Sequence, residues 1–466
     1  MGKKIGALLT IGITLAIWFS PVPAGLKPQA WHLFALFMGT VVGFIAQPLA
    51  AGSVALIGMV MLALTNTLKF TEVLTAFSGT TVWLIACAFI LARAFIITGL
   101  GKRIAYLVMR SFGDSSLKLV YSLVISDIII GPAIPSNSAR AGGLVFPIVQ
   151  SLAQAFDSHP GDSSRKIGAY LMTSVFHIDF VVSAMFLTAM VGNPIAAELA
   201  KKILNVDITW MSWFVAASVP GIVALITIPY VLYKIYPPEI KKTPEAKAMA
   251  NKVLQDMGPV SKNEKIMLGV FVGLLGLWAT ADMTHLNGTL IAFMGLCVLL
   301  ITGVLTWDHV IKETKAWDTL IWVGSVILMS DYLNKTGFIP WFAKILENQM
   351  VGTSMITAVV LSFIIYLYSH YFFASMSAHI TSMYGALITL GVASGAPPFI
   401  SAFVVAMASN ICGCLTHFGS GPSPVFFGAG YVDQKTWWKL GFLVSLMHII
   451  IWVGIGGAWW KVLGYW

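Results

Sequence analysis

The sequence predicts an all-α polytopic membrane protein, with about 11 transmembrane helices and two re-entrant helical hairpins arranged as an inverted repeat. Composition is the first observation: 58% of the 466 residues are hydrophobic, 10% are charged, and the mean hydropathy is +0.85. Soluble proteins carry roughly 25% charged residues, so this chain cannot cover a water-facing surface of normal size. The other two observations are apolar runs of spanning length and two runs that small and polar residues interrupt. A soluble enzyme and a disordered chain are both excluded.

The uninterrupted apolar runs approach the roughly 20 residues that a spanning helix needs. We expect spans near 5–20, 31–47, 49–67, 77–98, 167–200, 211–235, 265–281, 287–306, 317–333, 398–430 and 437–464. Residues 1–30 form an N-terminal helix outside the repeat. We expect this helix to be retained rather than cleaved as a signal peptide, because the rest of the chain is also membrane-embedded.

The two interrupted runs, 119–156 and 354–390, predict re-entrant hairpins. In the first, the segment from Pro132 to Gly143 separates two arms of about 13–15 residues, which reach only about 20 Å at 1.5 Å per residue. This length falls short of the roughly 30 Å hydrocarbon core. Each hairpin must therefore enter and leave on the same side of the bilayer.

Loop charges orient the chain in the bilayer. With Lys3 and Lys4 inside, the basic loops on both sides of the first hairpin also fall on the cytoplasmic side, as does the Lys-rich linker 236–265. The second hairpin then enters from outside. The net charge of +9 lies in these short loops, so it indicates membrane orientation and not nucleic-acid binding. We expect a multi-pass protein of a bacterial-type plasma membrane with a cytoplasmic N-terminus.

The two halves of the chain, 31–235 and 266–466, resemble each other. Residues match in order at a constant offset near the start of each half: Thr81, Thr98 and Gly99 match Thr319, Thr336 and Gly337. We pair Ser136-Asn137-Ser138 in the first interrupted run with Ser377-Ala378-His379 in the second. Each copy has an odd number of crossings, so the copies are inverted. Inverted repeats with broken helices indicate a secondary transporter whose substrate site lies near the bilayer midplane.

The interruptions offer what an anion needs. Hydroxyl, amide and backbone N–H groups gather there at helix N-termini, each of which carries about half a positive charge. The candidate substrate-binding residues are Ser136, Asn137, Ser138, Arg140, Thr188, Ser377, Ala378, His379, Thr416, Gly421 and Pro422. Arg140 could instead pair with the internal acid Asp127, and we interpret Asp179 as a packing or mouth residue. Ser136, Asn137 and Gly192 could hold Na⁺ if transport is coupled to sodium.

Enzymatic and cofactor signals are weak. The sequence has no HExxH zinc motif and no GxxxxGK[ST] nucleotide loop, and His379 is the one candidate base near a serine at the tips. Cys412 and Cys414 lack further ligands at metal spacing, so we expect packing residues there and no metal. The prediction is a transporter, not an enzyme, without a cofactor other than a coupling Na⁺.

The motif 135–140, followed by Gly142-Gly143, resembles the divalent anion/sodium symporter family. Further matches are 80–84, 373–379 and 413–416, so the resemblance covers nearly the whole chain and is closest to the dicarboxylate-exchanger branch. It implies a homodimer, an elevator-type movement of both tips, and substrate contacts from Ser136, Asn137 and Ser138. Ser138 stands where the family has Thr.

At the second tip, Ser377-Ala378-His379 stands where the family has Ser-Asn-Thr, which removes an oxygen ligand for Na⁺. We therefore expect Na⁺-independent exchange of dicarboxylates such as 2-oxoglutarate, malate, succinate or fumarate. The alternative is a Na⁺-coupled di- or tricarboxylate symporter. In an exchanger, an empty site made positive by Arg140, His379 and the hairpin dipoles would be costly to move without an anion.

Overall fold

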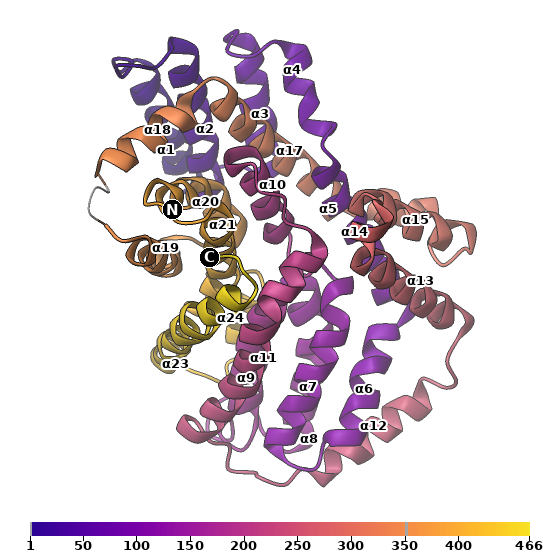
Figure 1. The fold of residues 1–466 in the computed structure, drawn as a ribbon. Helices are drawn as coiled ribbons and strands as arrows, with labels where there is room; N and C mark the ends of the chain where they lie inside the picture. The colour runs from indigo at the N-terminus through magenta and orange to yellow at the C-terminus, as the bar shows by residue number, and fades with distance from the viewer. Residues whose placement is uncertain (1, 350–352) are drawn as a thin grey trace.

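The computed structural model describes residues 2–349 and 353–466 as an almost entirely helical chain (Figure 1). The α-helices before the linker are α1 (Lys3–Trp18), α2 (Pro28–Ala46), α3 (Ala51–Leu64), α4 (Phe70–Leu74), α5 (Thr80–Thr98), α6 (Leu100–Phe112), α7 (Ser116–Ile130), α8 (Phe146–Ala155), α9 (Gly168–Met185), α10 (Gly192–Leu204) and α11 (Trp210–Ile235). In the linker lies α12 (Pro244–Asp256).

The α-helices after the linker follow the same order. They are α13 (Lys262–Ala279), α14 (Ala281–Thr284), α15 (Gly288–Ile301), α16 (Trp307–Lys312), α17 (Thr314–Lys335), α18 (Phe338–Gln349), α19 (Met355–Ser369), α20 (Met376–Ala393), α21 (Pro398–Ile411), α22 (Ser423–Gly428), α23 (Gln434–His448) and α24 (Gly456–Val462). Short 3₁₀ turns are η1 (Thr75–Phe77), η2 (Gly131–Ala133), η4 (His370–Phe372) and η5 (Cys412–Cys414), and π-helical turns are η3 (Ser138–Val145) and η6 (Ile449–Ile455).

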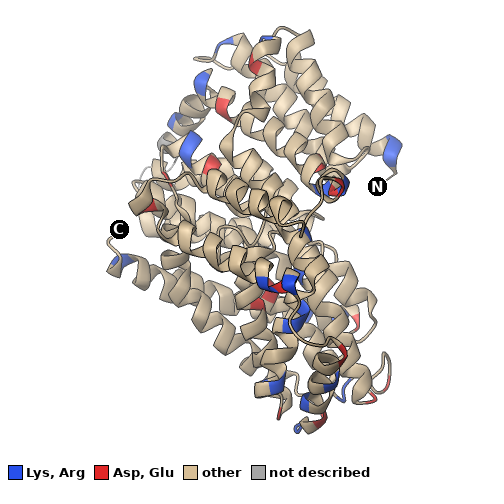
Figure 2. Cartoon of the chain, turned by 90° about the vertical axis from the view of Figure 1, so that its right-hand side faces the viewer, with Lys and Arg blue, Asp and Glu red and all other residues tan. Residues whose placement is uncertain are grey.

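The predicted fold class is confirmed. Among the described residues, eight helical stretches are long and apolar enough to cross a membrane, and three shorter apolar helices accompany them. The predicted count of about 11 crossings stays a prediction, because length and apolarity alone do not fix it. Many charged residues gather at the lower end of the molecule in Figure 2, the end at which α12 lies in Figure 1.

Two predicted spans are each divided by a break. The run 167–200 forms α9 and α10 with residues 186–191 between them, and the run 398–430 forms α21 and α22 with residues 415–422 between η5 and α22. We call these the first break (186–191) and the second break (415–422). Gly192 opens α10 with Pro194 in its first turn, and Pro422 is the N-cap of α22. Proline suits these positions because the first turn of a helix has no use for its missing N–H.

Each predicted hairpin has two helical arms joined at a tip. The first tip (134–138) joins α7 and η2 to η3 and α8, and the second tip (373–377) joins α19 and η4 to α20. At the first tip Ser136 Oγ accepts a hydrogen bond from the Ala139 N–H at 3.3 Å. At the second, Ser375 Oγ accepts from the Ala378 N–H, also at 3.3 Å.

These caps correct the predicted pairing of the tips, which was wrong by two residues. Ser136 corresponds to Ser375, so Asn137 corresponds to Met376 and Arg140 to His379. The backbone agrees, because the N–H of Arg140 and that of His379 each bond to the carbonyl of the capping serine. The error arose because a serine stands at both position 375 and position 377, and the sequence alone does not show which of them caps the helix.

The most buried helix lies behind the first tip. All 18 residues of α9 are buried, and α7, α8, α11 and α21 pack around it. A helix that is buried on every side has no face in contact with water or lipid, which is consistent with this central place. Asp179, the one acid on α9, is therefore held in the interior of the protein.

Candidate functional site

The two tips and the two breaks meet around one cavity of about 450 Å³. Its lining residues are Pro135, Ser136, Asn137 and Ser138 of the first tip, Met190, Val191 and Gly192 at the first break, Ala374, Ser375, Met376 and Ser377 of the second tip, Phe418, Ser420, Gly421 and Pro424 at the second break, and Gln47, Phe89, Thr319 and Trp322. We call it the tip cavity. Its volume lies within the roughly 300–1,000 Å³ of small-molecule sites.

Three helices begin at the wall of the tip cavity. They are η3, which continues into α8 and starts at Ser138, α10, which starts at Gly192, and α20, which starts at Met376. The partial positive ends of their dipoles therefore face one volume. The described lining side chains include no charged group. An anion here would be held by backbone N–H groups, hydroxyls and helix dipoles rather than by an ion pair.

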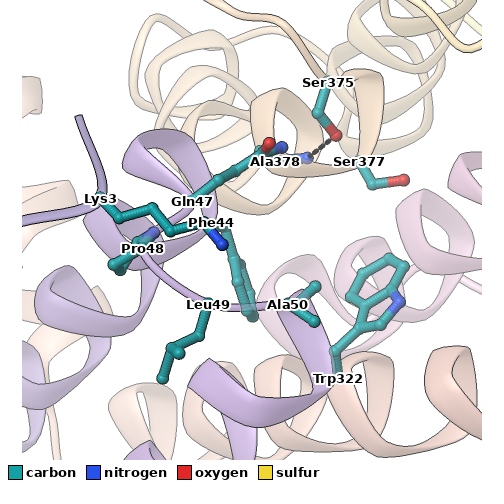
Figure 3. Close-up of a pocket in the computed structure, with 11 residues that line it drawn as sticks. Lys3, Phe44, Gln47, Pro48, Leu49, Ala50, Trp322, Ser375, Ser377 and Ala378 are labelled. Atoms are coloured by element: carbon teal, nitrogen blue, oxygen red, sulfur yellow. Dashed lines mark hydrogen bonds between the residues drawn. The ribbon is translucent and has the colours of Figure 1, made fainter. Parts of the chain in front are cut away.

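A second cavity of about 460 Å³ adjoins the tip cavity and shares Gln47, Trp322, Ser375 and Ser377 with it. Figure 3 shows that it lies between the second tip and the turn that joins α2 to α3, with Lys3 at its far side. The Ser375 hydroxyl is turned onto the Ala378 N–H, whereas the Ser377 side chain points away from its own helix. Ala378 lines this adjoining cavity and not the tip cavity.

Arg140 lies behind the first tip and does not line the tip cavity. Its Nε donates to Asp127 Oδ1 at 2.9 Å, and its Nη2 donates to Asp179 Oδ1 at 2.7 Å. Its Nη1 donates to the carbonyls of Ile134, at the tip, and Ala189, in the first break, at 3.1 and 2.8 Å. Of the two predicted roles, the structure places Arg140 with internal acids and not at the substrate cavity. The side chain ties the tip to the break.

Asn137 belongs to the same network. Its side-chain nitrogen donates to Asp179 Oδ2 at 2.8 Å and to Ser183 Oγ at 2.7 Å. The amide nitrogen is therefore turned into the protein, while the residue itself lines the tip cavity. Asp179 thus orients a tip residue as well as Arg140, a role that sequence reasoning missed. The signal was available, because an ionisable residue inside an apolar helix is a functional candidate by default.

His379 takes the place of Arg140 in the second half, and it also lies behind its tip. Its Nε2 lies 2.9 Å from Ser369 Oγ and its Nδ1 lies 3.0 Å from His370 Nδ1, while His370 Nε2 donates to the Gly419 carbonyl at 2.8 Å. The His379 ring packs on Tyr366, with centroids 3.9 Å apart. The predicted contact between His379 and a substrate carboxylate is therefore not what the structure shows. The histidine pair ties the second tip to the second break.

The remaining predicted residues divide between cavity and interior. Thr188 lines a separate cavity of about 490 Å³ and donates to the Pro132 carbonyl at 2.9 Å. Thr416 is buried, and Pro422 caps α22 without lining the tip cavity. Gly421 does line it, and a Cβ there would overlap Ser138 Oγ. This close approach brings the second break of one half against the first tip of the other.

The three residues predicted for a sodium site, Ser136, Asn137 and Gly192, all line the tip cavity. Their hydroxyl, amide and carbonyl oxygens are ligand types that suit a hard cation. At the second tip, the position that corresponds to Asn137 is Met376, whose thioether is not such a ligand.

A family model described as the sodium:sulfate symporter transmembrane region matches residues 2–466. The chain belongs to this family. It is therefore a multi-pass membrane transporter and not an enzyme. The chain is 49% identical over 465 residues to "Putative malate transporter YflS" of Bacillus subtilis, covering 100% of this chain and 97% of that protein. It is 47% identical to dicarboxylate transporter 1, chloroplastic, of Spinacia oleracea, covering 100% of this chain and 82% of that protein.

A solved structure shares the fold at low sequence identity. The YdaH transporter of Alcanivorax borkumensis, whose crystal structure is described as having an unusual topology, superposes with a TM-score of 0.59 at 12% identity. The similarity covers 99% of this chain and 98% of that one. The likeness therefore extends over nearly the whole length of both chains.

Proposed function

We propose that this transporter exchanges dicarboxylates, such as 2-oxoglutarate, malate, succinate or fumarate, across a bacterial plasma membrane, without Na⁺. The observation that carries the proposal is the meeting of two opposed hairpin tips at one cavity without charged lining side chains. A diacid has two anionic ends, and each tip offers one helix N-terminus with its own hydroxyl, Ser138 or Ser377. The names of relatives that are 47–49% identical point to the same substrate class.

The helix ends also supply a reason for exchange. With Arg140 and His379 behind the tips, the positive potential of the empty site comes from the N-termini of η3, α10 and α20. Moving such a site through a low-dielectric region without a bound anion leaves those N–H groups unsatisfied, which is costly. A bound diacid removes that cost. Return of the carrier would therefore require a second anion.

The proposal includes an elevator-type movement in which both tips travel with their breaks. Two buried networks favour movement of each pair as one body, since Arg140 joins the first tip to Ala189 and His370 joins η4 to Gly419. It also includes a homodimer, which rests on the family resemblance.

Na⁺-coupled symport is the alternative, and the first tip favours it. Ser136, Asn137 and Gly192 could place a hydroxyl, an amide oxygen and a carbonyl around one Na⁺ at the tip cavity. The second tip argues for exchange, because Met376 stands where Asn137 would supply an oxygen in the first half.

Uptake of radiolabelled 2-oxoglutarate into proteoliposomes separates the two functions, with internal dicarboxylate and external Na⁺ varied independently. We expect uptake that requires an internal diacid and is indifferent to Na⁺. Uptake into vesicles without internal diacid, driven by a Na⁺ gradient, would establish the symporter instead. Labelled substrate should be recovered unchanged in either case.

A further inference from the structure

Three possible metal ligands converge behind the second tip. His370 lies on η4, His379 in the first turn of α20 and Cys412 at the start of η5, and all three are fully buried. Their nearest ligand atoms lie within 4.8 Å of one another. The two histidines lie on the two arms of one hairpin, and the fold places Cys412, which comes later in the chain, beside them.

The distances are close to those of a metal centre. His370 Nδ1 lies 3.0 Å from His379 Nδ1, and Cys412 Sγ lies 3.9 Å from His379 Nδ1. With zinc–nitrogen and zinc–sulfur bonds of about 2.0 and 2.3 Å, tetrahedral ligation separates two nitrogens by about 3.3 Å and a nitrogen from a sulfur by about 3.5 Å. These two separations differ from the tetrahedral values by a few tenths of an ångström. The ligand atoms of Cys412 and His370 lie within 4.8 Å of each other, so the thiol must move toward His370 by up to about 1.3 Å to complete the site.

The outer nitrogen of each ring already has an oxygen partner: a backbone carbonyl for His370 and a serine hydroxyl for His379. His370 Nε2 donates to the Gly419 carbonyl at 2.8 Å, and His379 Nε2 lies 2.9 Å from Ser369 Oγ. A ligating histidine almost always bonds its other ring nitrogen to a carbonyl, a carboxylate or a water. The two Nδ1 atoms therefore face each other and remain available as ligands for one ion.

Proton accounting also favours a metal. The Ser369 hydroxyl has a single proton and donates to the Tyr366 carbonyl at 3.0 Å. With metal on both Nδ1 atoms, His379 Nε2–H donates to Ser369 Oγ and Ser369 keeps its bond to Tyr366. Without a metal, His370 holds its proton on Nε2 and donates it to the Gly419 carbonyl. His379 then donates from its Nδ1 to His370 Nδ1, which leaves His379 Nε2 without a proton. That nitrogen competes with the Tyr366 carbonyl for the single proton of the Ser369 hydroxyl.

We propose that His370 Nδ1, His379 Nδ1 and Cys412 Sγ form a binding site for a d¹⁰ metal ion of zinc type. Binding forms one metal–sulfur and two metal–nitrogen bonds. The Cys412 thiol proton, which is now directed at the Ser409 carbonyl, passes to solvent. A water fills the fourth position. The bound ion joins η4, α20 and the end of α21, and through Gly419 it holds the second break beside the tip cavity.

The test uses Cd²⁺ as a probe on the purified full-length protein in detergent, because a cadmium–thiolate bond absorbs in the ultraviolet. We expect one Cd²⁺ per chain, about one proton released for each ion, and a higher unfolding temperature. Cys412→Ser should abolish the absorption band. The matched control is Cys414→Ser, since Cys414 is buried on the same turn but lies outside the cluster.

A second variant tests the site without removing a ligand, in case Cys412→Ser does not fold. Ser369→Ala keeps all three ligands and removes the partner of His379 Nε2, so it should weaken Cd²⁺ binding by about tenfold or more. No thiolate band after prolonged warm incubation of the wild-type protein would overturn the proposal. So would a band that persists in Cys412→Ser, or equal affinity in Ser369→Ala and wild type. None of these readouts depends on what the protein transports.

Discussion

Ser377 presents a free hydroxyl to both the tip cavity and the adjoining cavity, while the hydroxyl of Ser375 is used as a helix cap. We expect Ser377→Ala to raise the KM for dicarboxylate by about tenfold or more, because a hydrogen bond to a charged group contributes about 1.5–3 kcal/mol. Initial uptake rates over a range of substrate concentrations measure this change. Ser151→Ala on α8 is the control, since that hydroxyl bonds the Pro147 carbonyl of its own helix. Equal KM values in the two variants would remove Ser377 from the site.

Arg140 is a residue whose loss should affect stability before it affects affinity. Arg140→Ala leaves Asp127 and Asp179 buried without their partner, and breaking a buried ion pair from one side costs about 3–5 kcal/mol. We expect a large loss of folded protein in thermal unfolding followed by size-exclusion chromatography. Arg165→Ala is the control, because Arg165 is only half-buried and contacts the Pro237 carbonyl and the Tyr236 ring, so its loss leaves no buried acid without a partner. If the two variants were equally stable, the buried network would not hold the first tip.

At the residue scale, the sequence predicted which residues of the tips line the tip cavity, but not the buried partners of Arg140 and His379. Ser136, Asn137, Ser138 and Ser377 do line the tip cavity, since small polar residues that interrupt an apolar run are visible in the sequence. Arg140 and His379 are equally visible, but which way a buried side chain points depends on partners from other helices. The partners of His379, for example, are brought together only by tertiary packing.

At the element scale, α12 of the linker is attached to the turn between α6 and α7. Lys247 on α12 forms an ion pair of 2.5 Å with Asp114, and the N–H of Thr243 donates to the Asp114 carbonyl. The hydrogen bond from Lys247 lowers the pKa of the Asp114 carboxyl below its ordinary value. A lowered folded-state pKa means that the attachment is present above the unfolded pKa and is lost as the pH falls through the folded pKa.

We therefore expect acidification to loosen α12 before the transmembrane helices are affected. Hydrogen–deuterium exchange of residues 244–256, corrected for the intrinsic pH dependence of exchange, should rise as Asp114 becomes protonated. In Asp114→Asn the exchange should be raised already at neutral pH and should not change further across that window. An identical acid-induced rise in the variant and the wild type would assign the transition to another group.

The helices also show which features of the fold the lengths of apolar runs can predict and which they cannot. The hairpins were predicted because arms of about 20 Å cannot span the bilayer, and that argument needs only length. The pairing of the two tips failed because it needed to know which serine caps α20, and capping is settled by backbone geometry. The runs 167–200 and 398–430 were each counted as one span, although the glycines and prolines at 192–194 and 419–422 predict a break in each. Length and apolarity alone do not show that such a break ends one helix and starts another.

At the scale of the whole molecule, the cavities suggest the side from which the site is reached. The tip cavity continues into the adjoining cavity, which ends at Lys3 and the turn between α2 and α3. The positive-inside rule puts Lys3 on the cytoplasmic side. Thr80, Thr188 and Trp210 line a separate cavity, which the same rule predicts to lie on the outer side. We therefore predict that the tip cavity is open toward the cytoplasm.

Cysteine labelling tests this assignment directly. In a Cys297→Ser background, which removes the exposed native thiol, Ser377→Cys should react with a membrane-impermeant maleimide added to the cytoplasmic side, and an added dicarboxylate should slow the reaction. Thr80→Cys is the matched control. It is exposed at the separate cavity, so it should react from the outside and be indifferent to substrate.

The outcomes separate orientation from conformation. If both cysteines react only from the side opposite to the one expected, the chain is inserted with the reverse orientation and the cavities keep their relation to each other. If Ser377→Cys reacts from both sides, and substrate shifts the balance between them, the carrier alternates between two open states. Labelling of Ser377→Cys that ignores dicarboxylate from either side would contradict the assignment of the tip cavity as the substrate site, because a diacid bridging Ser138 and Ser377 must cover that position.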